Sequence, residues 1–159
     1  MCDFDIEGKK TLEVGCGLGL TSLMLSQRSA DITCTDYHPE AQNFLEVNTS
    51  LNDSREIPFF LADWAKASKH EEKFDLIIGS DLLYEDEHYL LLSEFIERFA
   101  NTQCEVIIVD PGRCHLNRFT ARMKELSYSF CQEKPGNQDY LSSPFKGTIN
   151  RYSRAKKTY

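Results

Sequence analysis

Residues 12–21 read Leu12-Glu13-Val14-Gly15-Cys16-Gly17-Leu18-Gly19-Leu20-Thr21, and this stretch decides how the rest of the 159-residue chain is interpreted. It predicts the end of a buried strand, a glycine-rich turn and the first turn of a helix. Glycines at such a junction let the backbone turn tightly and let a ligand approach without meeting a Cβ atom. The following helix directs its free N–H groups and the positive end of its dipole toward an anionic part of the ligand. Several kinds of nucleotide-binding protein share such a turn, so the details of the loop must distinguish them.

The glycine spacing separates this loop from two common phosphate-binding loops. The dinucleotide fingerprint has glycines at its first, third and sixth positions, whereas Gly15, Gly17 and Gly19 occupy the first, third and fifth. The Walker A loop is excluded because no Gly-Lys-Ser/Thr follows. Glu13, two places before the first glycine, suits a ligand with a cationic amino-acid end better than one with a pyrophosphate. S-adenosylmethionine has such an end, with both an ammonium and a sulfonium group.

The pattern Glu-x-Gly-x-Gly-x-Gly resembles motif I of the class I, seven-β-strand methyltransferases. The resemblance implies S-adenosylmethionine as the cofactor and S-adenosylhomocysteine as its product. It also implies that this segment contacts the cofactor through Glu13, Gly15, Cys16, Gly17 and Gly19, where the small side chain of Cys16 fits inside the loop. The alternative is a glycine-rich turn that has only a structural role.

Composition and cysteine usage limit the class of protein. A length of 159 residues with 41% hydrophobic and 27% charged residues fits one globular domain. No apolar run approaches the roughly 18 residues of a membrane span, and the first residues lack the features of a signal peptide. The six cysteines are scattered without a Cys-x-x-Cys pair, and no histidine cluster has ligand spacing, so we expect no metal site and no disulfide framework. We therefore expect reduced thiols in a cytoplasmic protein.

The formal net charge of −7 at pH 7 bears on the partners. Nucleic-acid binding depends on clustered lysine and arginine, and the one basic cluster, residues 151–157, lies at the C-terminus. We therefore expect neither a nucleic-acid nor a membrane partner. An acidic surface favours a cationic cofactor and a substrate that carries a lysine or another amine.

Strand and helix patterns alternate along the whole chain, which predicts an α/β fold with helices on both faces of a parallel sheet. The expected strands are residues 10–14, 30–35, 58–61, 74–79, 105–109, 128–132 and 148–152, and the expected helices are residues 18–28, 40–51, 117–126 and one that begins at Asp86 or Glu87. This is the element order of the seven-strand methyltransferases, so we expect a Rossmann-like, doubly wound, mostly parallel seven-stranded sheet. Residues 1–159 then form a single class I methyltransferase domain whose N-terminal covering segment is short or missing.

Residues that follow the second, third and fourth strands are candidates for cofactor binding. Asp36 ends the second strand about twenty residues after the glycine loop, the position from which a carboxylate binds both ribose hydroxyls. The alternative role is a strand-end cap. Tyr37 is expected against the adenine ring. The resemblance to the class I methyltransferases implies that Asp63 bonds the adenine amino group. It also implies that Trp64 borders the adenine pocket, and the alternative for Trp64 is a core position. Ser80, at the end of the fourth strand, completes the predicted set.

The segment after the fourth strand carries the candidate catalytic residues. Asp81-x-x-Tyr84 resembles the Asp/Glu-x-x-Tyr motif of the protein-lysine methyltransferases once grouped as nicotinamide N-methyltransferase-like. A turn similar to residues 110–113 (Asp-Pro-Gly-Arg) occurs in the lysine methyltransferase of the electron-transfer flavoprotein β subunit. The resemblance implies methyl transfer to a protein lysine, in which Asp81 binds the ammonium and assists its deprotonation while Tyr84 shapes the pocket. The structural alternatives are that Asp81 caps a turn and Tyr84 belongs to the core.

Three other functions stay open at this stage, of which a hydride-transferring dehydrogenase is already disfavoured by Leu20 and Glu13. A small-molecule N-methyltransferase would act on free amines or pyridines without a protein acceptor. A non-catalytic binding module would keep the cofactor pocket and methylate nothing. The four histidines, His38, His70, His88 and His115, are isolated in the sequence, and we expect them at the surface or at helix caps. For Arg113 the sequence leaves open a contact with the substrate or a pair with an acidic residue.

Overall fold

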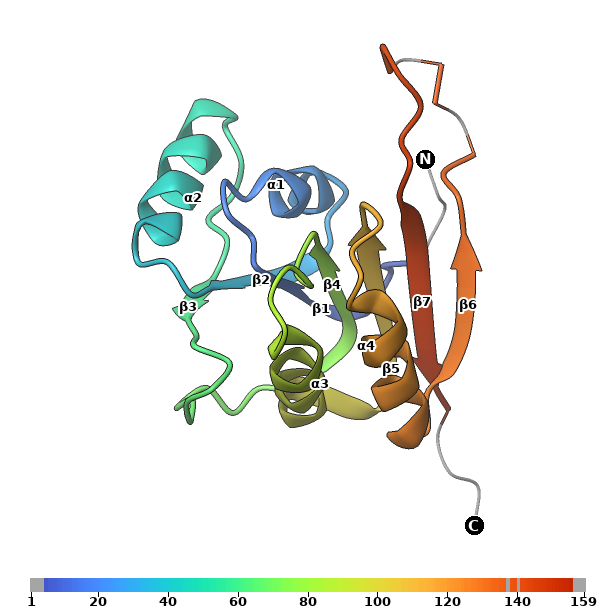
Figure 1. Ribbon diagram of the computed structural model, residues 1–159. Helices are drawn as coiled ribbons and strands as arrows, with labels where there is room; N and C mark the ends of the chain where they lie inside the picture. Colours follow the sequence, from blue (N-terminus) through green and yellow to red (C-terminus); the bar gives the residue numbers. More distant parts are fainter. Residues whose placement is uncertain (1–4, 137, 140, 156–159) are drawn as a thin grey trace.

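The computed structural model describes residues 5–136, 138–139 and 141–155, in which strands and helices alternate (Figure 1). The strands are β1 (Lys10–Val14), β2 (Asp31–Asp36), β3 (Phe59–Leu61), β4 (Phe74–Ser80), β5 (Ala100–Asp110), β6 (Ser129–Glu133) and β7 (Thr148–Arg154). The helices are α1 (Leu20–Gln27), α2 (Glu40–Leu51), α3 (His88–Phe99) and α4 (Leu116–Glu125).

The strands form one seven-stranded sheet in the order β3-β2-β1-β4-β5-β7-β6. Strands β1 to β5 pair in parallel, and β7 runs antiparallel to both β5 and β6. Helices α1 and α2 cover one face of the sheet, and α3 and α4 cover the other (Figure 1). The predicted α/β, Rossmann-like, mostly parallel sheet is confirmed.

The strand order reverses between β1 and β4, and this reversal positions the site. After β1 the chain moves outward through β2 to β3, then returns to the other side of β1 as β4. The two strands pair directly, with Val14 opposite Gly79 at their carboxyl ends. In open α/β sheets a ligand crevice forms at such a switch point, outside the carboxyl ends of the strands. The fold therefore places the glycine loop beside residues 80–84.

Two apolar cores hold the helices to the sheet, and β4 contributes to both. Ile77 packs in the core under α3 and α4, whereas Leu76 and Ile78 pack in the core under α1 and α2. All three side chains are buried. This double burial is the reason that β4 has a near-continuous apolar sequence rather than an alternating one.

Strand β5 begins five residues earlier than the sequence predicts. Residues 100–104 (Ala-Asn-Thr-Gln-Cys) are mostly polar and give a weak strand signal. In the structure, α3 passes directly into β5, and Ala100 pairs with Phe74 before the register shifts and resumes at Leu76 opposite Glu105. Pairing with the edge of β4 therefore extends the strand where local propensity does not.

Helix α2 has the predicted bounds but buries a narrower face than its pattern predicts. Ala41 and Leu45 are buried, whereas Phe44 and Val47 are about half exposed, at 49% and 56%. The helix packs beside α1 at the edge of the sheet, so its second apolar stripe has no strand beneath it (Figure 1). Within the described residues, no helix combines the length and apolar character needed to cross a bilayer.

Gly79→Ala is expected to destabilise the fold by about 1–3 kcal/mol, because it overpacks a filled space. A Cβ atom at Gly79 would lie 2.5 Å from Leu82 Cδ1 and 3.1 Å from the carbonyl oxygen of Val14. Gly136→Ala is the matched control, since a Cβ atom there meets nothing within 4 Å. Urea denaturation followed by Trp64 fluorescence measures both variants. If Gly79→Ala were as stable as Gly136→Ala, the packing of Leu82 against Gly79 would not contribute to the stability of the fold.

Candidate active site

A cavity of about 430 Å³ lies at the carboxyl ends of the parallel strands, within the size range of small-molecule sites. Its lining residues are Gly15, Asp36, Tyr37, Asp63, Trp64, Ser80, Asp81, Leu82, Tyr84, Glu85, His88 and Leu91. Most of the predicted site residues therefore meet around one cavity. Four do not line it, namely Glu13, Cys16, Gly17 and Gly19. A larger cavity of about 600 Å³ between α2 and β3 contains none of the predicted residues.

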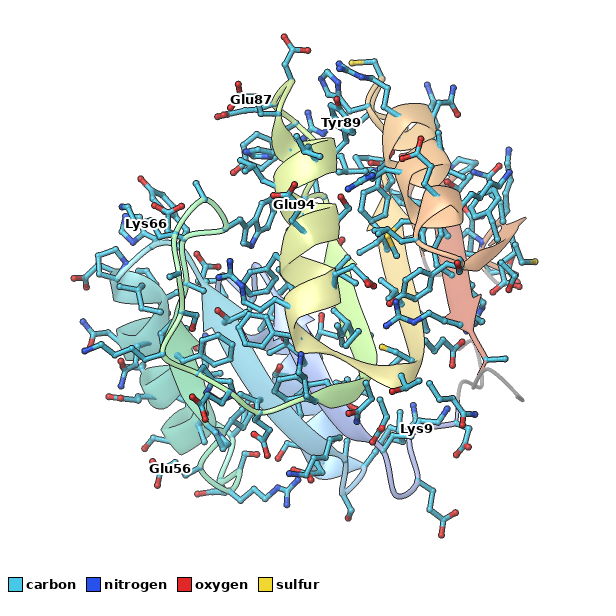
Figure 2. The ribbon with its side chains drawn as sticks, turned by 90° about the horizontal axis from the view of Figure 1, so that it is seen from below. Lys9, Glu56, Lys66, Glu87, Tyr89 and Glu94 are labelled. Carbon is cyan, nitrogen blue, oxygen red and sulfur yellow. The ribbon has the colours of Figure 1, made fainter. Side chains whose placement is uncertain are left out.

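Two segments from opposite halves of the sheet close around this cavity. Figure 2 shows the loop after β3, which carries Lys66, beside the N-terminal half of α3, whose start carries Glu87 and Tyr89. Trp64 from that loop meets His88 of α3 edge to face, with ring centroids 5.2 Å apart. The cavity is thus bounded by chain segments that are far apart in the sequence.

The glycine loop is shaped by left-handed backbone angles. Gly15, Gly17 and Gly19 have φ values of 66°, 52° and 73°, in the region that favours glycine. The N–H groups of Gly15 and Cys16 donate to the carbonyl oxygen of Thr35 in β2, at 2.9 and 3.1 Å. The backbone itself therefore requires the three glycines, and only Gly15 among them also lines the cavity.

Cys16 and Cys34 form a buried thiol pair behind the loop. Cys16 is 7% exposed and Cys34 fully buried. The pKa of Cys16 is raised, mainly by a hydrogen bond between the two side chains and secondly by burial. The Cys16 thiol consequently stays protonated, and its small side chain fills space inside the turn.

Glu13 anchors the first turn of α1. Its carboxylate is 6% exposed and accepts hydrogen bonds from the backbone N–H of Ser22, at 3.0 Å, and from the Ser22 hydroxyl. Burial raises the pKa of Glu13, while the hydrogen bonds from Ser22 and Thr21 oppose that rise. The carboxylate thus sits at the positive end of α1 without lining the cavity.

Asp36 links the end of β2 to the glycine loop. Its Oδ2 accepts from the N–H of Gly17 at 2.9 Å, and its Oδ1 accepts from the N–H of His38 at 2.9 Å. A carboxylate has about four acceptor sites, so each oxygen of Asp36 can accept one more hydrogen bond. The neighbouring Tyr37 is 71% exposed and borders the cavity. Asp36 is therefore held in place by the protein while keeping acceptors for two ligand hydroxyls.

Asp63 and Trp64 form the wall after β3. The Lys66 ammonium, 2.8 Å away, and the N–H of Ala65 hold the pKa of Asp63 below its usual range. The Trp64 ring is half-buried and packs against both His88 and Phe95 of α3. The sequence left open whether Trp64 belongs to the core or borders the pocket, and in the structure it does both, because it packs against the core and lines the cavity.

Asp81 and Arg113, which follow β4 and β5, form a bidentate ion pair. Arg113 Nε donates to Asp81 Oδ1 at 2.7 Å, and Nη2 donates to Oδ2 at 2.9 Å. The hydrogen bond with Asp81 raises the pKa of Arg113. Asp110 fixes the turn that aims Arg113, since its Oδ1 accepts from the N–H groups of Gly112 and Arg113 at 2.8 and 2.7 Å. The sequence left the partner of Arg113 open, and the structure identifies it as Asp81.

Asp81 has a backbone conformation that is rare outside glycine. Its φ is 56°, and its N–H donates to the carbonyl oxygen of Val109 at 2.9 Å. Such strain persists where the surroundings fix the residue, and it is common in active sites. The left-handed residue turns the chain from β4 toward Tyr84, which is 55% exposed. Tyr84 therefore lines the cavity and is not a core residue.

Four lining residues were not identified from the sequence, namely Leu82, Glu85, His88 and Leu91, and His88 is the one with an imidazole. The sequence pattern placed it at the surface or at a helix cap, but its side chain is only 14% exposed and lines the cavity. It lies between Trp64 and Tyr84, with edge-to-face ring contacts of 5.2 and 4.5 Å. Detecting it required the contact between α3 and the loop after β3, which no local pattern encodes.

The hydrogen-bond acceptors that line the cavity fit S-adenosylmethionine. Asp36 keeps two free acceptors for a vicinal diol, and Asp63 offers an acceptor at the end of β3. Open space surrounds Gly17, where a Cβ atom would meet nothing within 4 Å, so bare backbone faces outward there.

Comparison with known proteins gives consistent matches. Residues 3–125 match the profile of a family described as lysine methyltransferase. The chain is 33% identical over 109 residues to the histidine protein methyltransferase 1 homolog of Dictyostelium discoideum, covering 63% of this chain and 35% of that protein. It is 27% identical over 112 residues to the EEF1A lysine methyltransferase 3 of Xenopus tropicalis, covering 69% of this chain and 50% of that protein. The chain thus spans about a third to a half of the length of these relatives.

A solved structure shares the fold. The magnesium protoporphyrin IX methyltransferase from Synechocystis PCC 6803, crystallised with bound S-adenosylmethionine, superposes with a TM-score of 0.72 at 17% identity. The match covers 95% of this chain and 72% of that one. At this identity the likeness shows the fold alone.

Glu13→Gln is expected to stabilise the protein at neutral pH and to lose that advantage in acid. Burial holds the pKa of folded Glu13 above its usual value of 4.5, so the folded state binds this proton more tightly than the unfolded state. Wild-type stability therefore falls as the pH rises from the unfolded pKa to the folded one, and stays lower above it. A glutamine can still accept from Ser22 and never ionises. Urea denaturation at pH 4.5, 6 and 7.5 measures the difference.

The matched control for this substitution is Glu71→Gln, because Glu71 is an exposed glutamate outside the site. Its stability difference from the wild type should stay within about 0.5 kcal/mol throughout. A Glu13→Gln difference that does not change between pH 4.5 and 7.5 would contradict a raised pKa at Glu13.

Proposed function

The chain belongs to the lysine methyltransferase family, as its motifs predicted, and we propose that it transfers a methyl group from S-adenosylmethionine to a lysine amine of a protein. The observation that carries this proposal is the meeting of two sets of residues at one cavity. Gly15 and Asp36 come from the cofactor half of the sheet, and Asp81 and Tyr84 come from the acceptor half.

The cofactor is proposed to lie along the ends of β1, β2 and β3. Asp36 accepts hydrogen bonds from the two ribose hydroxyls, and Asp63 accepts one from the adenine amino group. Tyr37 and Trp64 border the adenine, while Ser80 closes the far side. Glu13, Cys16, Gly17 and Gly19 act from behind the cavity, because they fix the loop whose backbone faces the amino-acid end of the cofactor.

The acceptor amine is proposed to enter between Asp81 and Tyr84. Asp81 attracts the ammonium and orients it, while Tyr84 confines the substrate side chain. When bound, the sulfonium supplies a methyl carbon that a neutral amine attacks in line. Because the reaction needs little from the protein beyond alignment and proton removal, holding the two groups in register provides much of the acceleration.

The comparisons name other acceptors as well. The relative from Dictyostelium discoideum is named as a histidine methyltransferase, so a histidine ring nitrogen is the second candidate acceptor. A small-molecule amine and a non-catalytic binding role are the remaining alternatives.

The described cysteines are free thiols, which is typical of a reducing compartment and supports a cytoplasmic protein.

S-adenosylmethionine and S-adenosylhomocysteine are expected to raise the melting temperature of the protein, and NAD is not. A ligand at about one hundred times its dissociation constant adds roughly 2.7 kcal/mol of stability. Asp36→Ala should abolish the shift, because it removes the ribose acceptors. Asp31→Ala, at the exposed opposite end of β2, is the matched control and should keep it. A shift with NAD, or an unchanged shift in Asp36→Ala, would contradict the cofactor assignment.

Asp81→Asn is expected to lower methyl transfer about tenfold to a thousandfold while leaving S-adenosylhomocysteine affinity within about threefold. The asparagine cannot bind an ammonium or Arg113 as a carboxylate does. The assay follows tritium from methyl-labelled S-adenosylmethionine into lysate proteins, and mass spectrometry then identifies the modified residue. Asp86→Asn, which changes an aspartate that is 87% exposed and does not line the cavity, is the control. Full transfer by Asp81→Asn would exclude this role.

A further inference from the structure

We propose that His88 accepts the proton that the acceptor amine must lose before methyl transfer. The inference rests on the proposed function and adds a catalytic residue to it. It comes from three features of the structure: the hydrogen bond that fixes the ring, the position of the free ring nitrogen, and the engagement of Asp81 by Arg113.

The hydrogen bond of His88 fixes which ring nitrogen carries the proton. His88 Nδ1 lies 2.8 Å from the carbonyl oxygen of Leu82. A carbonyl oxygen only accepts, so Nδ1 must carry the hydrogen and donate it. In the neutral ring, Nε2 is therefore left with a lone pair that can accept a proton.

The second ring nitrogen, Nε2, belongs to a side chain that lines the cavity and lies beside a carboxylate. The ring is held between Trp64 and Tyr84 and lines the cavity that Asp81 also lines. Nε2 lies 3.5 Å from a carboxylate oxygen of Glu85, which is 69% exposed. A protonated ring would therefore gain a charge partner, and Glu85 reaches solvent, to which the proton can pass.

Other charged groups around the ring are already paired within the protein. Asp63 is paired with Lys66, and Asp81 is paired with Arg113. The Tyr84 ring makes an edge-to-face contact with the imidazole, with ring centroids 4.5 Å apart. Glu85 is thus the carboxylate in direct reach of Nε2.

Asp81 is less suited to take the proton than the sequence predicts. Both of its oxygens accept from Arg113, at 2.7 and 2.9 Å, and protonating the carboxylate would disrupt these two charge-assisted hydrogen bonds. The two tasks are therefore divided. Asp81 attracts and orients the ammonium, and His88 removes its proton.

The step balances as a simple proton transfer followed by displacement. The ammonium of the acceptor gives one proton to His88 Nε2, which leaves a neutral amine and an imidazolium. The amine lone pair then forms the new nitrogen–carbon bond as the carbon–sulfur bond breaks, and that bonding pair stays on sulfur. His88 finally releases its proton to solvent beside Glu85.

The first test reads the ring itself and needs no turnover. Nitrogen-15 NMR of histidine-labelled protein with S-adenosylhomocysteine should show the neutral His88 ring protonated on Nδ1. Addition of n-butylamine, a mimic of the lysine side chain, should then shift the His88 Nε2 signal. A ring protonated on Nε2, or no response to n-butylamine at saturating cofactor product, would overturn the proposal.

The second test uses His88→Asn, whose amide N–H can still donate to Leu82 but which has no group in place of Nε2. Tritium transfer from methyl-labelled S-adenosylmethionine to lysate protein should fall about tenfold to a thousandfold. Without a proton acceptor, the rate of the variant should follow the neutral fraction of the acceptor amine, so it should rise about tenfold per pH unit below the amine pKa of about 10.4, more steeply than the wild-type rate. S-adenosylhomocysteine affinity should stay within about threefold. Wild-type rates and an unchanged pH profile would refute the role.

His70→Asn is the matched control, because His70 stacks on Phe60 with centroids 4.0 Å apart and lies outside the cavity. It should lower stability and keep the pH profile of the wild type. If the wild type labels no protein at all, the proposed function fails, and the NMR test still decides whether His88 is a proton acceptor.

Discussion

The site depends on how the side chain of Leu82 is seated. Its two methyl groups occupy the space that two glycines leave free, since a Cβ atom at either Gly15 or Gly79 would lie 2.5 Å from one of them. Leu82 thereby fastens the segment after β4 against the glycine loop after β1. Its carbonyl oxygen also fixes the ring of His88. Leu82 therefore contacts the glycine loop, the end of β4 and the start of α3 at once.

Four carboxylates in and behind the cavity share one feature: each accepts hydrogen bonds from groups of the protein. Glu13 is bound by Ser22, Asp36 by Gly17 and His38, and Asp63 by Lys66 and Ala65, while Arg113 binds Asp81. These contacts orient the carboxylates before any ligand arrives. Preorganised groups of this kind stabilise developing charge without the cost of reorganising at the moment of reaction.

The sequence predicted what local signals encode and missed what depends on packing between distant segments. The bounds of β1 and α2 were predicted correctly, because a glycine loop ends the first and Pro39 precedes the second. The early start of β5 was missed because pairing with β4, not its polar sequence, makes it a strand. The ligand-side carboxylates could be predicted, since parallel strands bring their carboxyl ends to one edge.

The partners of those residues could not be predicted in the same way. Arg113 lies 32 positions from Asp81, and His88 meets Trp64 through the docking of α3 on the loop after β3. Neither contact follows from a periodic pattern, because each depends on where two separate elements come together. The exposed stripe of Phe44 and Val47 shows the same limit, since helical periodicity alone does not say how much of an apolar face a sheet will cover.

The proposed division of tasks between Asp81 and His88 is consistent with the electrostatics of a reaction between two cations. A sulfonium and an ammonium in one cavity repel each other, so the nearby positive charge favours the neutral amine. Asp81, already balanced by Arg113, can attract the ammonium without forming so strong a pair that its proton is retained. His88 adds a neutral acceptor whose charge appears only when the proton arrives, and Glu85 then lies beside it. An acidic rim that draws the acceptor in and an imidazole that takes its proton are therefore complementary parts of one cavity.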